Sequence, residues 1–162
     1  ELGELPNDAV KEMEKDIDRL KVITQRFSKI GSEPELEITE VNSQINEVLN
    51  YMDLRFGRNV EIVRDIGVDP IYVPLNSNLF HWVIENLVKN SIDAMKGKGR
   101  IICQSYIKNN HLIINIEDNG SGGVTKKSNS YGIDGVKERL NLIGLSMQIT
   151  SNTSGTIITI SI

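Results

Sequence analysis

Two asparagines lie four positions apart in "IENLVKNSIDAMKG", a stretch that otherwise reads as a buried amphipathic helix. At this spacing Asn86 and Asn90 lie one above the other at the edge of the apolar face, and Asp93 follows one turn later. Amide oxygens suit a hydrated Mg²⁺, and they accept hydrogen bonds without placing negative charge beside a phosphate. The alternative interpretation is that both asparagines simply face the solvent.

A carboxylate followed by glycines forms the second candidate. "IEDNGSGG" puts Asp118 at the end of an apolar run, with Gly120 and Gly122 close behind it. An aspartate held at the end of a strand can accept a hydrogen bond from an exocyclic amine such as that of adenine. Glycine allows the backbone to approach a ligand closely. A flexible turn after a strand is the alternative.

The elements around these residues can be read from periodicity and turn signals. A helix is predicted from Asn76 or Ser77 to about Met95, with positions 80, 83, 84, 87, 88 and 92 facing inward. Strands "RIICQSYI" and "HLIINIED" form a hairpin around "KNN", and a helix follows a polar loop, from about Gly135 to Ile143. The predicted fold is α+β: a two-layer α/β sandwich with a mixed, mostly antiparallel sheet and helices on one face.

Residues 7–30 form a separate long amphipathic helix in this prediction. Its apolar positions follow the 3-4-3-4-3 spacing of a coiled-coil seam, at Val10, Met13, Ile17, Leu20, Thr24 and Phe27. Gly31 ends the helix, and "GSEPE" reads as a hinge. A seam of this kind favours a bundle or dimer helix, whereas the alternative is a helix lying on its own domain.

Composition excludes several classes of function. A formal net charge of −4 argues against a nucleic-acid-binding face, which needs clustered basic residues. The single cysteine, Cys103, excludes an internal disulfide and a cysteine-clustered metal site. No apolar run reaches the roughly 18 residues of a membrane span, so no membrane contact by this segment and a cytoplasmic location are expected.

In this order and spacing, the segments resemble the Bergerat, or GHKL, ATP-binding fold, in particular the catalytic domain of two-component sensor histidine kinases. "ENLVKNSIDAM" resembles that family's N box, "DNGSGG" its G1 box, and "YGIDGVKERLNLIG" the G2 box of its short-lid branch. "TSNTSGTIITISI" resembles the closing hairpin. The resemblance covers about residues 36–162. It implies a catalytic ATP-binding domain at 35–162, and at 1–31 part of the second helix of the dimerisation and phosphoacceptor hairpin.

The resemblance also implies the ligands of ATP and Mg²⁺. Asn90 would coordinate Mg²⁺ and Asn86 would support the phosphate side, which makes both catalytic residues. Asp118 would accept the amine of adenine, and the G1 glycines would let the loop pass close to the base. The implied nucleotide-binding set is completed by Asp93 and by two glycines that would open the last helix, with N–H groups facing the phosphates, Gly132 and Gly135.

The loop between the G1 and G2 boxes, "VTKKSNSY", is short, and Ser130 stands where many relatives have glycine. Lys126 and Lys127 are candidates to reach the β- or γ-phosphate, with a solvated basic loop as the alternative. Tyr131 is a candidate to cover the base or ribose, with a packing role as the alternative. Arg139 is predicted to form an ion pair on the helix surface rather than to reach towards phosphate.

The activity implied is that of a protein-histidine kinase, exercised through a parent protein that can be membrane-anchored. Neither His81 nor His111 lies in an acidic, proline-flanked H box, so this segment is expected to bind Mg-ATP without carrying its own phosphoacceptor. The implied partners are a phosphoacceptor histidine domain of the same or a partner kinase, a response regulator, and a second copy through the opening helix. The alternatives are an anti-sigma-factor-like serine kinase and a degenerate scaffold module that binds only a protein partner.

Overall fold

The computed structural model describes residues 34–122 and 131–162. The predicted helix of residues 7–30 and its seam lie outside the described residues. The described elements are, in chain order, β1 (Glu37–Glu40), α2 (Val41–Phe56), β2 (Val60–Ile66), β3 (Tyr72–Leu75), α3 (Ser77–Ala94), β4 (Gly99–Lys108), β5 (His111–Asp118), α4 (Tyr131–Leu142), β6 (Ser146–Asn152) and β7 (Gly155–Ser161).

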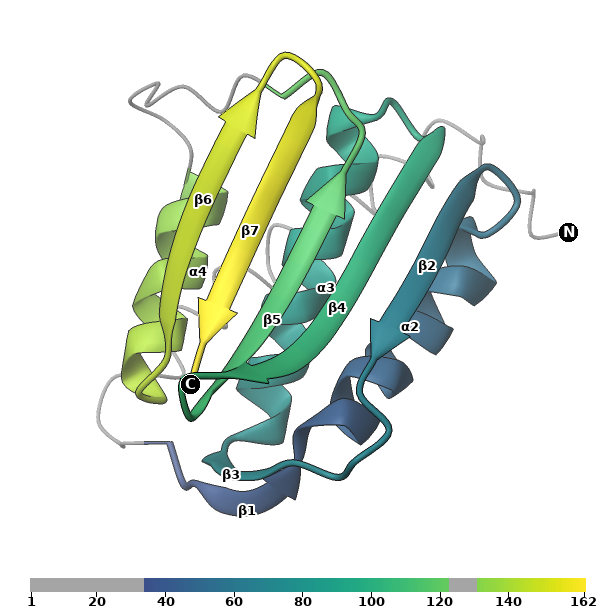
Figure 1. The fold of residues 1–162 in the computed structure, drawn as a ribbon. Helices are drawn as coiled ribbons and strands as arrows, with labels where there is room; N and C mark the ends of the chain where they lie inside the picture. The colour runs from purple at the N-terminus through teal and green to yellow at the C-terminus, as the bar shows by residue number, and fades with distance from the viewer. Residues whose placement is uncertain (1–33, 123–130) are drawn as a thin grey trace, which may run out of the picture. The chain divides into compact units, whose positions relative to one another are not determined.

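Five strands form the main sheet in the order β2-β4-β5-β7-β6. Only the β2–β4 pair is parallel, and the other three pairs are antiparallel. Strands β1 and β3 form a separate antiparallel pair. Helices α2, α3 and α4 all lie on one face of the five-stranded sheet (Figure 1). This arrangement confirms the predicted α+β sandwich.

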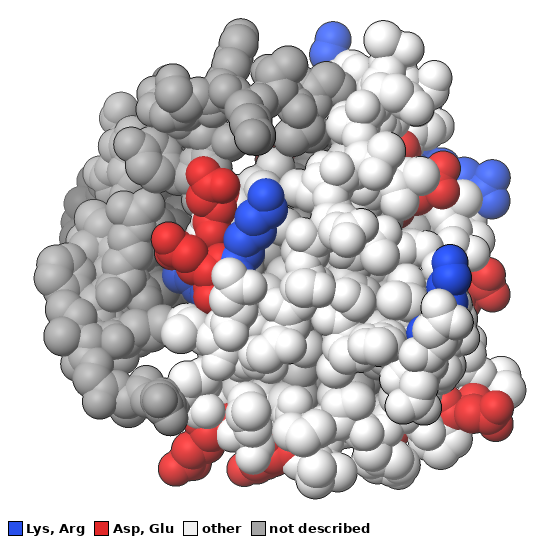
Figure 2. Space-filling model, turned by 60° about the vertical axis from the view of Figure 1, so that its left-hand side comes forward, with Lys and Arg blue, Asp and Glu red and all other residues white. Residues whose placement is uncertain are grey.

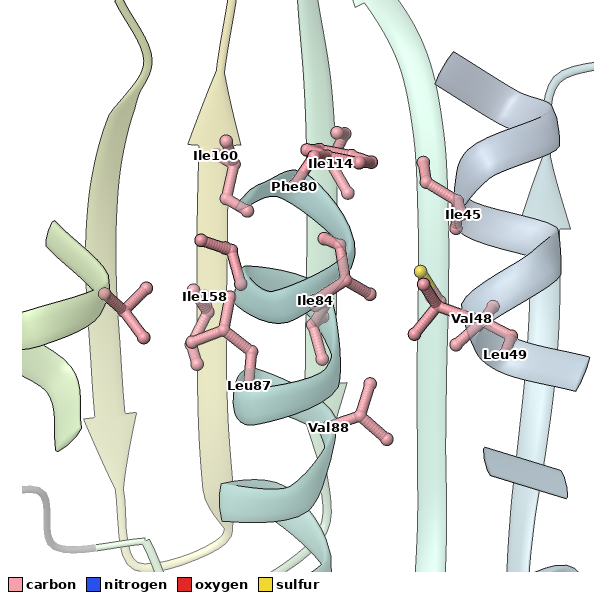
Figure 3. Close-up of a cluster of buried hydrophobic side chains, with 14 of the residues drawn as sticks. Ile45, Val48, Leu49, Phe80, Ile84, Leu87, Val88, Ile114, Ile158 and Ile160 are labelled. Carbon is pink, nitrogen blue, oxygen red and sulfur yellow. The ribbon is translucent and has the colours of Figure 1, made fainter. Parts of the chain in front are cut away.

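Helix α3 begins and ends where its sequence signals predict. The Asn76 side chain accepts a hydrogen bond from the Leu79 amide at 3.0 Å and caps the first turn. At the other end, Gly97 has a φ of 76°, and its amide donates to the Ile92 carbonyl at 2.9 Å. The predicted inward positions are all buried, namely Phe80, Val83, Ile84, Leu87, Val88 and Ile92. Figure 3 shows several of them within a cluster that also includes side chains of α2, β5 and β7.

The β4–β5 hairpin sets the direction in which Asp118 points. Asn109 and Asn110 both have positive φ, 51° and 63°, the conformation of a two-residue type I′ turn. Burial then alternates along β5, where Leu112, Ile114 and Ile116 face the helices. Asp118 continues this alternation, so its carboxylate lies on the helix side of the sheet, at the end of the row of core residues.

The last helix begins earlier than the sequence predicted. Helix α4 starts at Tyr131 rather than near Gly135, and it ends at Leu142. The helix therefore contains both Gly132 and Gly135, residues of low helix propensity. Buried residues at Val136, Leu140 and Ile143 have helical spacing, and tertiary burial of this apolar face outweighs the low helix propensity of glycine.

Cys103 lies in β4 and is fully buried. Burial raises the pKa of its thiol from 9.0 to about 12, against the opposing effect of the positive charge of Arg64. We therefore expect a thiol reagent at pH 8 to react with native protein roughly 1000-fold more slowly than with protein in guanidinium, because the native thiolate is depleted. The pKa of the thiol is raised only in the folded state. Its contribution to the free energy of unfolding is therefore fully present below about pH 9 and is lost as the pH rises towards 12.

Rapid labelling of Cys103 in native protein, at a rate independent of denaturant, would contradict this prediction. The Cys103→Ala variant is the matched control, because it leaves no thiol in the chain.

Charge is unevenly distributed along the described chain. Residues 140–162, which include β6 and β7, carry no Lys, Arg, Asp or Glu. Figure 2 shows a broad uncharged area on the face that it brings forward.

Within residues 34–122 and 131–162, no helix is both long and apolar enough to cross a membrane.

Candidate functional site

Asp118 is a buried carboxylate at the end of β5, only 5% exposed. One of its oxygens, Oδ1, accepts a hydrogen bond from the Gly120 amide at 3.0 Å. Its partner across the β5–β7 ladder is Thr156, which is also buried. Since a carboxylate has two oxygens and capacity for several hydrogen bonds, Asp118 retains acceptor capacity beyond the Gly120 bond.

Three glycines near Asp118 lie where the backbone or a neighbouring side chain leaves no room for a Cβ atom. A Cβ atom on Gly155, whose φ is 146°, would overlap the backbone oxygen of Asp118. A Cβ atom on Gly122, whose φ is 56°, would overlap the backbone oxygen of Asn152. At Gly120 a Cβ atom would lie 3.0 Å from the Cβ atom of Ala94, the last residue of α3. The glycine-flanked carboxylate is therefore a close-packed backbone structure rather than an open turn.

Replacing Gly155 with alanine is expected to destabilise the fold by about 3 kcal/mol or more, because a side chain there must displace strand β5. Gly144 is the matched control: it also has a positive φ, 74°, but nothing lies within 4 Å of its Cβ position. Gly144→Ala should therefore cost only about 1–2 kcal/mol, the backbone penalty alone. Urea denaturation of both variants measures the difference, and equal losses of stability would contradict this account.

The three residues of α3 that were predicted as ligands lie along its second half. Asn86 is half-buried, and Asn90 and Asp93 are exposed. The Asn86 side-chain nitrogen donates to the Trp82 carbonyl at 2.6 Å, which leaves Oδ1 of the amide available as an acceptor. Among the described residues there is no group of three or more His, Cys, Asp and Glu side chains that could hold a metal. A cation bound here would be coordinated by amide oxygens, such as that of Asn90, and by oxygens of the molecule bound together with it.

The end of α3 meets the glycine-rich loop. The Ser121 amide donates to the Ala94 carbonyl at 3.4 Å, and Ala94 also faces Gly120. Asn90 lies one helical turn before Ala94. The asparagine motif and the carboxylate motif, which are about 30 residues apart in the sequence, thus adjoin at one end of the molecule. The Asp118 carboxylate can accept a hydrogen bond from an amine, and the uncharged asparagine amides can bind a polyanion that carries a cation. Both kinds of acceptor thus lie at the same end of the molecule.

Helix α4 adjoins the same end. Arg139, late in α4, lies over Trp82, early in α3. The two helices run in opposite directions (Figure 1). The start of α4 therefore lies beside the later turns of α3. Gly132 is the second residue of α4, within the first turn, whose amides have no partner in the helix, whereas Gly135 is the fifth. The expectation that Gly135 opens the helix is therefore wrong, because α4 begins one turn earlier.

Three predicted ligands cannot be placed in the structure. Lys126 and Lys127 lie outside the described residues. Tyr131 begins α4, but its side chain is not among those described.

The structure also adds contacts that the sequence alone did not indicate. Thr156 and Gly155, in the expected closing hairpin, lie against Asp118 through the β5–β7 pairing, and Ala94 lies against Gly120. Asn119 fixes the start of the loop, because its side-chain oxygen accepts from the Arg100 amide at 2.9 Å. Ser91, next to Asn90, is buried, and its hydroxyl has no hydrogen-bond partner among the described residues. Most of these contacts join segments that are far apart in the sequence, so local patterns do not predict them. Only the hairpin pattern of residues 146–162 indicated any of them.

Comparison with solved structures identifies the fold. The histidine kinase AdeS of Acinetobacter baumannii has a TM-score of 0.79 at 17% identity, covering 99% of this chain and 86% of AdeS. The mycobacterial sensor histidine kinase MprB has a TM-score of 0.65 at 18% identity, covering 78% of this chain and 96% of MprB. Full-length ShkA in complex with AMPPNP has a TM-score of 0.75 at 13% identity, covering 99% of this chain and 39% of ShkA.

No protein-family model matches the chain. The structural matches define the fold of the chain as that of histidine kinase catalytic domains.

Proposed function

We propose that this chain is the ATP-binding catalytic domain of a two-component sensor histidine kinase. It binds Mg-ATP and transfers the γ-phosphoryl group to a histidine outside residues 1–162. The bond from the γ-phosphorus to the β,γ-bridging oxygen breaks, a bond to an imidazole nitrogen forms, and ADP leaves.

The observation that supports this proposal most strongly is the buried Asp118 carboxylate among close-packed glycines, next to the asparagine-bearing helix. Asp118 accepts the exocyclic amine of adenine, and Gly120 and Gly122, which pack against Ala94 and the backbone of Asn152, hold the loop that passes close to the base. The similar fold of ShkA, whose structure contains AMPPNP, agrees with an adenine nucleotide as the ligand.

Magnesium belongs on the phosphate side of this site. Asn90 supplies an amide oxygen to Mg²⁺, and Asn86 and Asp93 support the phosphates and the metal's water shell. Held there, Mg²⁺ would supply positive charge against the charge that develops on the transferring phosphoryl group. The free amides of the first turn of α4, including that of Gly132, face the phosphates. Lys126 and Lys127 approach the β- or γ-phosphate, and Tyr131 approaches the base or ribose.

The phosphoacceptor comes from elsewhere. His81 is half-buried on α3, 3.9 Å from the Glu47 carboxylate, and His111 is bound into the β4–β5 turn through the Asn109 carbonyl at 2.9 Å. We propose that residues 1–31 are part of the second helix of a dimerisation and phosphoacceptor hairpin, and that the chain works in a cytoplasmic homodimer. A response regulator then takes the phosphoryl group from the histidine.

Radiolabelled ATP and a separately prepared phosphoacceptor hairpin from a related kinase test this function. We expect Mg²⁺-dependent label on the hairpin that is labile in acid and stable in base, as phosphohistidine is. Acid-stable label would indicate a serine kinase instead. No label on a hairpin that its own kinase domain phosphorylates would contradict the proposal.

A further inference from the structure

A cation–π contact joins α4 to α3 below the candidate site. The guanidinium carbon of Arg139 lies 3.8 Å from the ring centroid of Trp82, and both side chains are half-buried. A planar guanidinium over an indole at this distance is a favourable arrangement, and partial burial strengthens it. The contact therefore adds to the packing of α4 against α3.

Gly135 makes room for this contact. Arg139 turns back along its own helix, and its Nη1 donates to the Gly135 carbonyl at 3.0 Å. A Cβ atom on Gly135 would lie only 3.2 Å from the same Nη1. Gly135, which was expected to open the helix, thus lies within it, against the folded-back side chain of Arg139.

Trp82 is also bonded to the candidate site. Its carbonyl accepts the side-chain nitrogen of Asn86 at 2.6 Å, one turn further along α3. One residue thus carries the ring on which Arg139 lies and the carbonyl that orients the Asn86 amide. Through Trp82, Arg139 of α4 is thus joined to the turn of α3 that carries Asn86.

We propose that Arg139 is a positioning residue for the nucleotide site. By lying over Trp82 it holds the first turn of α4 at a fixed place relative to Asn86 and Asn90, without touching the nucleotide. This inference rests on the proposed function, because it gives Arg139 a role in Mg-nucleotide binding. This role differs from a direct contact between Arg139 and phosphate. It also differs from a cation–π contact that only stabilises the packing of the two helices.

Calorimetric titration of ADP, with and without Mg²⁺, tests the inference on Arg139→Met, Trp82→Leu and the double variant. We expect each single change to weaken Mg-ADP binding by about 3- to 30-fold, as the loss of a partly buried cation–π contact predicts. Binding of adenosine, which has no phosphates, should change less than about twofold in the same titrations, since the adenine end depends on Asp118 and its glycines.

The double variant distinguishes the mechanisms. If Arg139 acts through Trp82, the double variant binds Mg-ADP no more weakly than either single variant. Additive losses would overturn the inference in favour of direct contact with phosphate. A lowered melting temperature with unchanged affinity would overturn it in favour of packing alone.

Lys137→Met is the matched control, because Lys137 is an exposed cation on the same helix. It should leave affinity unchanged. Arg139→Lys keeps the charge but loses the planar guanidinium, so its affinity for Mg-ADP should lie between those of the wild type and Arg139→Met. This variant also controls for misfolding of the apolar variant.

Trp82 is the only tryptophan in the chain, so its emission reports the stack directly in variants that retain it. We expect Arg139→Met, but not Lys137→Met, to shift this emission in the absence of nucleotide, and unshifted emission would overturn the inference. If the wild type itself binds no nucleotide, the proposed function fails and this inference with it. If the wild type binds and Arg139→Met binds equally, the inference alone fails.

Discussion

Replacing Asp118 with asparagine is expected to weaken ADP binding by about 10- to 150-fold, the value of one hydrogen bond to a charged group. The new amide has the same shape as the carboxylate, and its oxygen can keep the bond that the Gly120 amide now gives to Oδ1. Its NH₂ group then faces the amine of adenine, donor against donor. Displacement of a fluorescent nucleotide measures the loss.

Asp69→Asn is the control for this charge change. Asp69 is exposed in the β2–β3 connection, away from Asp118, and the same substitution there should leave affinity within about twofold. Because Asp118→Asn preserves volume and the Gly120 bond, its melting temperature should stay close to that of the wild type. Wild-type affinity in Asp118→Asn would remove the adenine-binding role of this carboxylate.

Replacing Asn90 with alanine is expected to abolish most of the gain in nucleotide affinity that Mg²⁺ provides, a loss of about tenfold or more. Phosphoryl transfer should fall with it, because the metal stabilises charge on the transferring group. Asn90 is exposed, and alanine is the better helix former, so the variant should be at least as stable as the wild type. Titration of Mg²⁺ at fixed ADP measures the effect.

Asn141→Ala provides the same chemical change on the exposed surface of α4, and it should leave the magnesium dependence intact. If Asn90→Ala kept the full magnesium dependence, the metal would have to be held by other groups, and the assignment of Asn90 would be wrong.

Local sequence signals were sufficient for much of the framework. Two consecutive asparagines gave the β4–β5 turn, and the run of β-forming residues after it gave the strand that ends at Asp118. Asn76 at the start of α3 and Gly97 after its end likewise gave that helix its bounds. Each of these signals acts within a few residues, where backbone conformation and side-chain period follow directly from residue type.

The parts that the sequence did not reveal depend on contacts between distant segments. Gly155 lies against Asp118 only because β7 pairs with β5. Helix α4 begins at Tyr131 because its apolar face is buried, despite its glycines. Arg139 was predicted as a surface ion-pair partner, and the ring of Trp82 beneath it could not be foreseen, because nothing local links the two residues.

Calorimetric titration of the 162-residue chain with ADP and Mg²⁺ tests the central claim most directly. We predict saturable heat with a stoichiometry of one nucleotide per chain, reduced when Mg²⁺ is chelated. No heat from folded protein at millimolar ADP and Mg²⁺ would contradict the claim that Asp118, its glycines and the asparagines of α3 form a nucleotide site.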